Sequence, residues 1–210
     1  MTARALILGV PLLVGAGCGS ISRTFMNASW RDRWQQPAMV IHSLSLQTGN
    51  QVADLGAGGG YFTFRLADAV GSTGKVYAVD IDKGNLEYIA KQAAQRGYHN
   101  IETILAKPDN PLLPATGVDL IFTCNAYHHL TERTTYFRSA TRYLLPNGRV
   151  VIIDLAGKSW LFRILGHWTP KETSRREMEA AGYKLTNEFD FLTRQTFQVF
   201  EKNSQGSSTS

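Results

Sequence analysis

Short apolar runs that suit buried strands alternate along the chain with segments whose apolar residues recur at helical spacing. The pattern predicts strands at residues 51–55, 75–80, 101–105, 118–124 and 149–154, and helices at residues 61–70, 83–96, 131–145 and 171–181. Residues 183–191 and 195–201 are predicted as two closing strands after Gly182, a residue that suits the end of a helix. Strands and helices that alternate at this interval predict βαβ units and a parallel sheet.

The first predicted strand runs into a turn that is rich in glycine, and a carboxylate precedes the turn. Asp54 is followed by glycine at positions 56, 58, 59 and 60, and glycine permits positive φ and close approach of a ligand to the backbone. In the dinucleotide fingerprint GxGxxG a third glycine would stand where this chain has Tyr61. The spacing therefore disfavours a nicotinamide oxidoreductase, which we keep as a third alternative.

The charge of Asp54 indicates which kind of nucleotide this turn would accept. A carboxylate suits a cationic group such as an amino-acid ammonium, whereas it would repel a pyrophosphate. About twenty residues beyond the glycines, the second predicted strand ends at Asp80, whose carboxylate can accept both hydroxyls of a ribose. Together these residues predict a site for a nucleoside that carries an amino acid.

With these motifs, residues 51–154 resemble the class I S-adenosylmethionine-dependent methyltransferases. Residues 54–60 match the first motif of the family, Asp80 matches the acidic residue that binds the ribose, residues 117–130 match the fourth-strand motif, and residues 144–150 are similar to the turn into the fifth strand. The resemblance implies a Rossmann-like, mostly parallel seven-stranded sheet with helices on both faces and a C-terminal antiparallel hairpin. It implies S-adenosylmethionine as the cofactor, bound by Asp54, Gly56, Ala57, Gly58, Gly60, Asp80, Ile81, Lys107 and Asn125.

The segment from Asn125 to His129 indicates a narrower branch of this family. Two other features of the chain depart from the family pattern. The segment is similar to the branch that contains quinone C-methyltransferases and arsenite methyltransferases. Arsenite methyltransferases need several thiols, and this chain has only Cys18 and Cys124, which argues against an arsenic substrate. The family often has an acidic residue near the adenine after the third strand, but here Lys107 and Pro108 come before Asp109.

Methyl transfer needs few catalytic side chains, because the protein mainly positions the reactants and excludes water. His128 and His129 are the candidate general bases for an acceptor that carries an acidic C–H or a hydroxyl. The alternative is that one of them caps a helix or packs structurally. Tyr127 either faces the sulfonium or packs in the core. Two histidines without a third ligand nearby do not predict a metal site.

Two segments outside the motifs bear on the site. Residues 29–46 carry apolar positions at helical spacing, interrupted by Pro37, and such a segment could cover the cofactor. Residues 158–170 follow the fifth strand and contain Trp160, Phe162 and Trp168. They could line an apolar acceptor site or touch a membrane, or they could belong to the core. His167 is a secondary candidate base.

The composition and the charge distribution indicate which kinds of partner the protein can bind. The 210 residues suit one domain with a substantial core, and the 43% hydrophobic and 19% charged fractions are ordinary for a globular protein. The net charge is +5, but the basic residues are scattered and only Arg175 and Arg176 are adjacent. A nucleic-acid footprint clusters its basic residues on one face, so we expect no nucleic-acid partner and a small-molecule acceptor instead.

The two ends of the chain are predicted to lie outside the domain. Residues 1–18 show a positive start, an apolar run and small residues before Cys18, the layout of a secretory signal and similar to a lipoprotein signal, although Gly15 stands where such signals prefer leucine. We therefore expect an exported or membrane-anchored protein, with a cytoplasmic one as the alternative. Residues 19–201 form the predicted methyltransferase domain, and residues 202–210 a disordered tail.

The sequence therefore predicts a methyltransferase that uses S-adenosylmethionine and acts on an unidentified, lipophilic small molecule. The alternative is a non-enzymatic S-adenosylmethionine-binding protein that keeps the fold without turnover. The departure near the adenine and the predicted export signal both motivate this alternative, since an exported enzyme would have no obvious supply of the cofactor.

Overall fold

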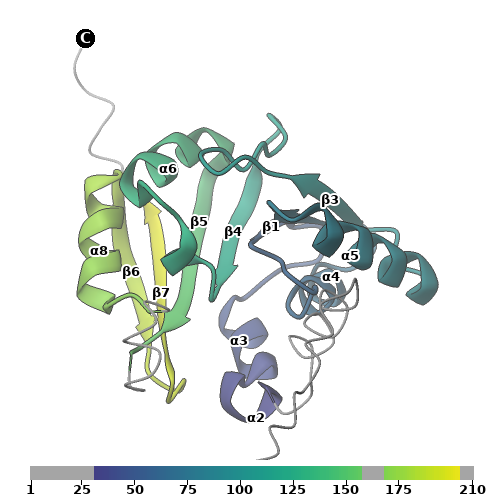
Figure 1. The fold of residues 1–210 in the computed structure, drawn as a ribbon, viewed down its shortest axis with the longest axis horizontal. Coiled ribbons are helices and arrows are strands. Elements are labelled where there is room, and N and C mark those ends of the chain that lie inside the picture. The colour runs from purple at the N-terminus through teal and green to yellow at the C-terminus, as the bar shows by residue number, and fades with distance from the viewer. Residues whose placement is uncertain (1–30, 158–167, 204–210) are drawn as a thin grey trace, which may run out of the picture.

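The computed structural model describes residues 31–157 and 168–203, which form one seven-stranded sheet with helices on both faces (Figure 1). The strand order is β3-β2-β1-β4-β5-β7-β6. The pairs among the first five strands are parallel, whereas β7 runs antiparallel to both β5 and β6. The predicted Rossmann-like sheet with its antiparallel C-terminal hairpin is confirmed.

The helices and strands follow one another as the apolar pattern predicts. The strands are β1 (Gln51–Leu55), β2 (Lys75–Asp80), β3 (Ile101–Leu105), β4 (Val118–Cys124), β5 (Leu144–Leu155), β6 (Tyr183–Phe189) and β7 (Gln195–Lys202). The α-helices are α2 (Asp32–Gln35), α3 (Pro37–Ser43), α4 (Thr63–Val70), α5 (Lys83–Arg96), α6 (Arg133–Ala140) and α8 (Lys171–Ala180), with short 3₁₀ turns η2 (Tyr127–His129) and η3 (Thr141–Tyr143).

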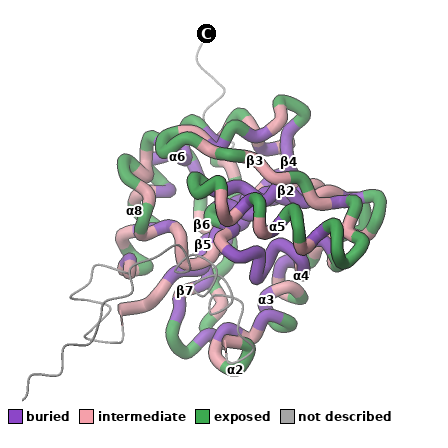
Figure 2. The backbone as a smooth tube through the Cα atoms, turned by 45° about the vertical axis from the view of Figure 1, so that its right-hand side comes forward, coloured by how far each residue is buried: buried purple, intermediate pink, exposed green. Residues whose placement is uncertain are grey.

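The sheet is buried on both faces, which explains its nearly continuous apolar strands. Successive residues of β4 point to opposite faces: Ile121 packs in the cluster under α6 and α8, and Phe122 packs in the cluster under α3 and α4. The central strands are buried along most of their length, whereas the outer surface of α5 is exposed (Figure 2). The sheet therefore forms a rigid platform with helical layers on both sides.

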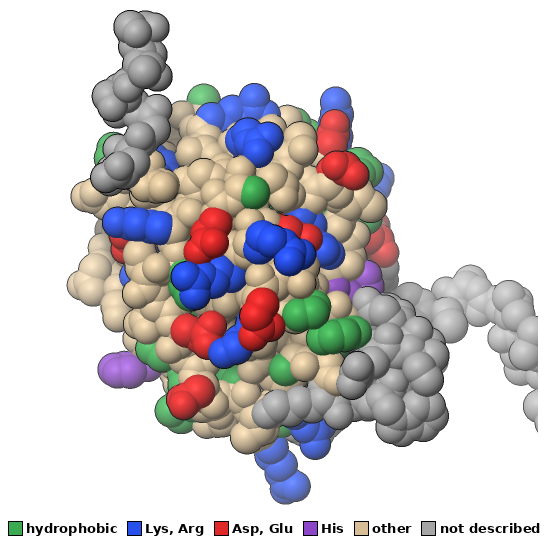
Figure 3. Space-filling view, turned by 90° about the vertical axis from the view of Figure 1, so that its left-hand side faces the viewer, with side chains coloured by type: hydrophobic (Ala, Val, Ile, Leu, Met, Phe, Trp, Pro, Cys, Tyr) green, Lys and Arg blue, Asp and Glu red, His purple; other side chains and the backbone are tan. Residues whose placement is uncertain are grey.

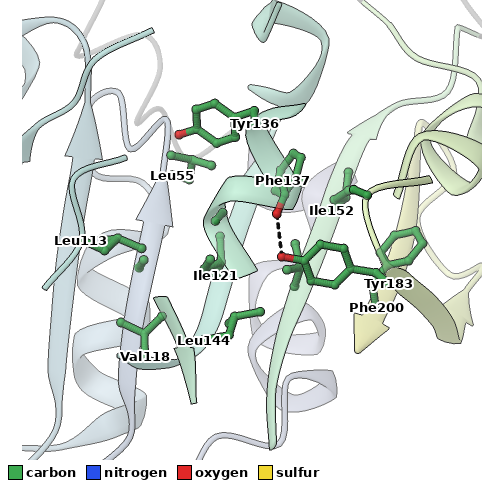
Figure 4. Packing of buried hydrophobic residues seen from close by; sticks show 14 of the residues in the cluster. Leu55, Leu113, Val118, Ile121, Tyr136, Phe137, Leu144, Ile152, Tyr183 and Phe200 are labelled. Atoms are coloured by element: carbon green, nitrogen blue, oxygen red, sulfur yellow. Dashed lines mark hydrogen bonds between the residues drawn. The ribbon is translucent and has the colours of Figure 1, made fainter. Parts of the chain in front are cut away.

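The cluster under α6 and α8 shows how the C-terminal hairpin joins the rest of the core. Side chains of β4 and β5 pack there with Phe137 of α6 and with Tyr183 and Phe200 of the hairpin (Figure 4). The hydroxyl of Tyr183 donates a hydrogen bond to the backbone oxygen of Phe137 at 2.9 Å. This bond satisfies a polar group in an otherwise apolar region, and it fixes α6 against the hairpin.

The structure corrects several predicted boundaries. The helix predicted at residues 131–145 ends at Ala140, and β5 begins at Leu144 because Leu144 pairs with Val118 of β4, with a shift of register before Leu120. The helix predicted from residue 61 begins at Thr63, after the last turn of the glycine-rich segment. Lys202, predicted as the first residue of the tail, is the last residue of β7, where it pairs with Tyr183.

Other predictions fall on residues outside the described part of the chain. These are the export segment at residues 1–18, residues 158–167 of the aromatic segment, with Trp160, Phe162 and His167, and residues 204–210 of the tail. Within residues 31–157 and 168–203, no helix is both long enough and apolar enough to cross a membrane.

Acidic and basic side chains are mixed on the face of the molecule seen in Figure 3. Lys171 pairs with Glu188 at 2.6 Å and Arg175 pairs with Glu179 at 2.8 Å. Over the described residues of this face, basic side chains that neutralise neighbouring carboxylates leave no continuous positive stripe, which is the pattern expected of a solvated surface.

Candidate functional site

The glycine-rich turn after β1 lies at the carboxyl edge of the sheet and is held there by backbone contacts. The N–H groups of Gly56 and Ala57 both donate to the backbone oxygen of Val79 in β2, at 2.8 and 3.1 Å. Gly56 has φ +76°, and a Cβ at this position would lie 2.3 Å from the Cβ of Ala126. Only glycine therefore lets the turn after β1 approach the loop after β4 so closely.

A cavity of about 290 Å³ lies beside this contact, at the ends of β1 and β4. Predicted site residues Asp54, Gly56, Ala57, Gly58 and Asn125 all line it. Gly59 of the predicted glycine turn lines it as well, whereas the sequence did not assign to the site the other residues of its wall, which are Arg31, Trp34, Tyr61, Phe62 and Cys124. Arg31 and Trp34 belong to the predicted segment 29–46, so this segment forms part of the cavity wall, and its role in covering a cofactor stays a prediction.

Asp54 is the buried carboxylate of this cavity, with 3% of its surface exposed. Burial raises the pKa of Asp54 to about 7, the hydroxyl of Thr63 opposes this by donating a 2.6 Å hydrogen bond, and the charge of Asp80 adds to the rise. Only the ionised form of the carboxylate attracts a cationic ligand group, and this form predominates above the pKa of Asp54. The site is thus ready to hold an ammonium group above about pH 7.

Asp80 stands at the end of β2 and organises the same turn from the other side. Its Oδ2 accepts the N–H of Gly58 at 2.8 Å, and its Oδ1 accepts the N–H of Asp82 at 2.8 Å. The side-chain amide of Asn85 also donates to Oδ2, at 3.4 Å. A carboxylate has about four acceptor positions, so these three bonds leave some capacity for a ligand hydroxyl. Asp80 therefore positions the glycine turn and can also accept hydrogen bonds from a ligand.

Besides Asp80 and the two histidines of η2, three predicted site residues do not line this cavity. Gly60 lines a separate surface hollow between α4 and α5. Ile81 follows β2 and is 67% exposed, and Lys107 is exposed two residues after β3, with its backbone paired to Asn110. The N–H of Ala106 donates to the backbone oxygen of Asp80, which places the ends of β2 and β3 side by side. The assignment of these three residues to a ligand stays a prediction.

Helix α2 is attached to the glycine turn through a group of four residues that we call the Tyr61 cluster: Arg31, Asp32, Tyr61 and Arg65. The guanidinium carbons of Arg31 and Arg65 lie 4.1 and 4.2 Å from the centre of the Tyr61 ring. The hydroxyl of Tyr61 donates to Asp32, which also pairs with Arg65 at 3.2 Å. Tyr61, which replaces the third glycine of the dinucleotide pattern, thus connects the turn to the segment that covers the cavity.

Cys124 ends β4 in the wall of the cavity, but its thiol is not a reactive group. Gln35 of α2 and Gln195 of β7 direct their side-chain amides at its sulfur, at 3.0 and 3.6 Å. Burial raises the pKa of Cys124 to about 12, so the thiolate form is absent at neutral pH. Cys124 therefore contributes shape and a weak acceptor to the cavity wall.

The structure distinguishes between the two candidate bases in η2. The Nδ1 atom of His128 lies 2.6 Å from Oδ1 of Asp154, and the two side chains are 4% and 1% exposed. His129 lies with its ring centre 4.1 Å from that of His128 and is exposed. A carboxylate that accepts the Nδ1 proton fixes the tautomer of His128 and leaves Nε2 as the basic nitrogen.

A partly buried hydrogen-bonded group of three residues holds η2 in place. Glu177 of α8 accepts the hydroxyl of Tyr127 at 2.7 Å and pairs with Arg133 through two bonds of 2.8 and 2.9 Å. Tyr127 is fully buried and stacks on Phe137, so this residue packs in the core and the alternative role at a ligand is wrong. The result is a fixed backbone on both sides of His128.

The buried charge of Asp54 leads to a testable prediction. Between about pH 4 and pH 7 the unfolded chain loses a proton that folded Asp54 retains, so the free energy of unfolding falls as the pH rises, by roughly 4 kcal/mol in all. We expect Asp54→Asn to raise the melting temperature of the ligand-free protein by at least about 5 °C at pH 8, and by clearly less at pH 5. Thermal unfolding followed by circular dichroism measures both. A variant that is no more stable at pH 8 than the natural protein would contradict the assignment of a buried ionised carboxylate.

A family model for a methyltransferase domain matches residues 46–202 of the chain. An aklanonic acid methyltransferase from Streptomyces sp. is 39% identical over 74 residues, which cover 35% of this chain and 34% of that protein. A ubiquinone/menaquinone biosynthesis C-methyltransferase from Ectopseudomonas mendocina is 26% identical over 154 residues, which cover 72% of this chain and 58% of that protein. The chain thus spans about a third to three-fifths of the length of these curated relatives.

A solved structure supports the fold assignment. The crystal structure of a SAM-dependent methyltransferase from Aquifex aeolicus superposes with a TM-score of 0.79 at 22% identity, covering 86% of this chain and 96% of that one. At this identity the likeness establishes the arrangement of the sheet and helices. The carboxyl edge that carries Asp54, Asp80 and Asn125 is therefore the edge at which open α/β sheets bind their ligands.

Proposed function

The chain belongs to the methyltransferase domain family, and we propose that its described domain transfers the methyl group of S-adenosylmethionine to a small, apolar acceptor molecule. The observation that carries the proposal is the convergence of Asp54, Gly56, Gly58 and Asn125 on one cavity, with Asp80 bonded to the same turn. A buried carboxylate, close-approach glycines and a second carboxylate at the next strand are the groups that an amino-acid-bearing nucleoside needs.

The residues present fit S-adenosylmethionine. Arg31 and Asp54 both line the cavity, and their opposite charges suit the carboxylate and the ammonium of the amino-acid group. Asp80 would accept the ribose hydroxyls. Ile81 and Leu105 are 67% and 51% exposed at the ends of neighbouring strands, where apolar side chains can cover a face of the adenine. When bound, the cofactor supplies an electrophilic methyl group.

The protein contributes positioning and a base. His128 takes up the proton that the acceptor loses, and Asp154 holds the ring and stabilises its positive charge while the proton is bound. The pair is buried, so bulk water does not compete for the proton. The loop that carries His128 also carries Asn125, which brings the base and the cofactor cavity to the same end of β4.

The acceptor is apolar in this proposal, and the names of the relatives support that choice. One relative is a methyltransferase of aklanonic acid, and others act in ubiquinone and menaquinone biosynthesis. The helices and strands near the carboxyl edge supply Trp34, Phe62 and Trp168 as described aromatic residues of the cavity walls. Aromatic walls favour a ring-bearing acceptor over a highly charged one.

Calorimetry with the full chain tests the proposal. We expect S-adenosylhomocysteine to bind with micromolar affinity, and 5′-methylthioadenosine, which lacks the amino-acid group, to bind at least about tenfold more weakly, because it makes no contact with Arg31 or Asp54. Methyl transfer is then followed with isotope-labelled S-adenosylmethionine across a panel of phenols, quinols and carboxylic acids. Failure of S-adenosylhomocysteine to bind would refute the proposal. Binding without transfer to any acceptor would favour the non-enzymatic alternative.

A further inference from the structure

A second cavity, of about 370 Å³, lies at the edge of the sheet formed by the end of β5 and the start of β7. Its apolar walls include Trp168, Phe189, Leu192 and Phe197, and its polar wall includes Gln195 and Thr196. Leu155 of β5 pairs with Gln195 of β7, so this is the same carboxyl edge that carries the first cavity, two strands further along the sheet. The volume is within the range of small-molecule sites.

Gln195 connects the two cavities and has an unsatisfied polar atom. Its side chain is 4% exposed, and its Nε2 donates a 2.8 Å hydrogen bond to Oδ1 of Asn125, which lines the first cavity. Its Oε1 is buried and has no hydrogen-bond partner among the described residues. A buried amide oxygen without a donor costs about 1–3 kcal/mol, and a ligand that donates an O–H or N–H to it recovers that cost.

The His128–Asp154 pair lies between the two cavities in the order of the strands. The first cavity is at the ends of β1 and β4, Asp154 is at the end of β5, and the second cavity is at β5 and β7. Asp154 pairs in the sheet with Thr196, which lines the second cavity, and Thr196 donates a 3.4 Å hydrogen bond to its backbone oxygen. A base located between the cofactor cavity and an acceptor cavity can receive the proton that the acceptor loses when the methyl group is transferred to it.

The charges at the rim of the second cavity indicate what it would exclude. Among the described residues, three carboxylates, Glu172, Glu188 and Asp190, line it together with one cation, Lys171, which pairs with Glu188 at 2.6 Å. An anionic ligand would face an excess of negative charge, and the amide oxygen of Gln195 would repel it further. A neutral ring that carries a hydrogen-bond donor can pack against the aromatic walls and donate a hydrogen bond to Oε1 of Gln195.

We propose that the second cavity binds the methyl acceptor, that the acceptor is a neutral aromatic compound with a hydroxyl group, and that Oε1 of Gln195 accepts the hydrogen bond of that hydroxyl. This inference rests on the proposed methyl transfer and names the class of its acceptor. Gln195 orients the acceptor and, through Asn125, couples its position to the wall of the cofactor cavity. The specificity of the enzyme for a hydroxylated ring then resides in one side chain of β7.

A matched pair of probes tests the inference. The full chain, saturated with S-adenosylhomocysteine, is titrated in a calorimeter with 1-naphthol and with 1-methoxynaphthalene, which differ in the O–H donor. We expect 1-naphthol to bind at least about tenfold more tightly, because only 1-naphthol satisfies Gln195. Gln195→Met removes the amide and should bring the affinity ratio of the two probes close to one. Thr186→Val alters an exposed polar residue of β6 that lines neither cavity, and it should leave the ratio unchanged.

A second variant tests the location, and the outcomes separate the two proposals. Ala156 lines the second cavity, and Ala156→Phe should fill part of it and abolish 1-naphthol binding while S-adenosylhomocysteine still binds. Equal affinity for the two probes, no binding of either, or a ratio that survives Gln195→Met would overturn the inference and leave the proposed methyl transfer standing. If S-adenosylhomocysteine itself does not bind the natural protein, both proposals fail.

Discussion

Replacement of His128 by asparagine is expected to lower the rate of methyl transfer by roughly 10²- to 10⁴-fold, the usual contribution of a positioned general base. The amide nitrogen of asparagine can take the place of Nδ1 and keep the hydrogen bond to Asp154, which is 2.6 Å long in the natural protein. The variant therefore removes the basic nitrogen with little change in the buried contact. Single-turnover kinetics with labelled S-adenosylmethionine and the acceptor found in the panel measure the effect.

The neighbouring histidine supplies the control. His129 is exposed in the same 3₁₀ turn, and we expect His129→Asn to retain the rate within a fewfold. Calorimetry with S-adenosylhomocysteine should show unchanged affinity for both variants, because neither ring lines the first cavity. A fully active His128→Asn variant, or an equal loss in His129→Asn, would show that His128 is not the base.

Gly56→Ala is expected to weaken S-adenosylhomocysteine binding and to lower the rate of methyl transfer, the rate on the order of 100-fold, because a displacement of about 1 Å in a positioning turn can have an effect of that size on the rate. The new Cβ would lie 2.3 Å from the Cβ of Ala126, so the turn after β1 or the loop after β4 must move. The positive φ of +76° adds strain for any residue other than glycine. Calorimetry measures the affinity, and thermal unfolding measures the accompanying loss of stability.

Two further variants separate the steric effect from the strain of the backbone. Gly97 has almost the same φ, +74°, with no atom within 4 Å of an added Cβ, so Gly97→Ala should lower the melting temperature slightly and leave binding unchanged. Ala126→Gly removes the other partner of the clash, and adding it to Gly56→Ala should restore part of the affinity. If Gly97→Ala weakens binding as much as Gly56→Ala does, the crowding at Ala126 is not the cause.

The order of the strands and helices was predictable because a buried parallel sheet imposes strong local patterns. The strands β1, β2, β3 and β4 have the predicted boundaries. Of these, β1, β2 and β4 are apolar runs that end at a polar residue or a turn, whereas β3 is a partly buried edge strand with two polar residues in its middle. The region between α6 and β5 was not predictable to the same degree. Leu144 and Leu145 suit a helix by their local pattern, but the pairing of Leu144 with Val118 of β4 places them in a strand. A contact between residues distant in sequence decided the structure there.

The same distinction applies to the site. Asp54 and the glycines are contiguous, so their role follows from a local motif, and their convergence with Asn125 follows from the rule that parallel strands end at one edge. The spacing of residues 29–46 predicted a segment near the site, but no local pattern indicates that Arg31 itself lines the cavity. Gln195 contacts the cavity wall from β7, far along the chain, and no local spacing indicates it. The choice of His128 over His129 required knowing which ring reaches Asp154, a residue 26 positions further on.

Helix α2 is only four residues long, and a helix of that length has no stability of its own in water. Arg31, which precedes it, and Trp34 within it nevertheless form one side of the first cavity. Their place therefore depends on the Tyr61 cluster and on the hydrogen bond from Gln35 to Cys124. The local opening free energy of this segment is thus set by a few polar and cation–π contacts to residues of the cavity wall. Hydrogen exchange in α2 should report that free energy separately from global unfolding.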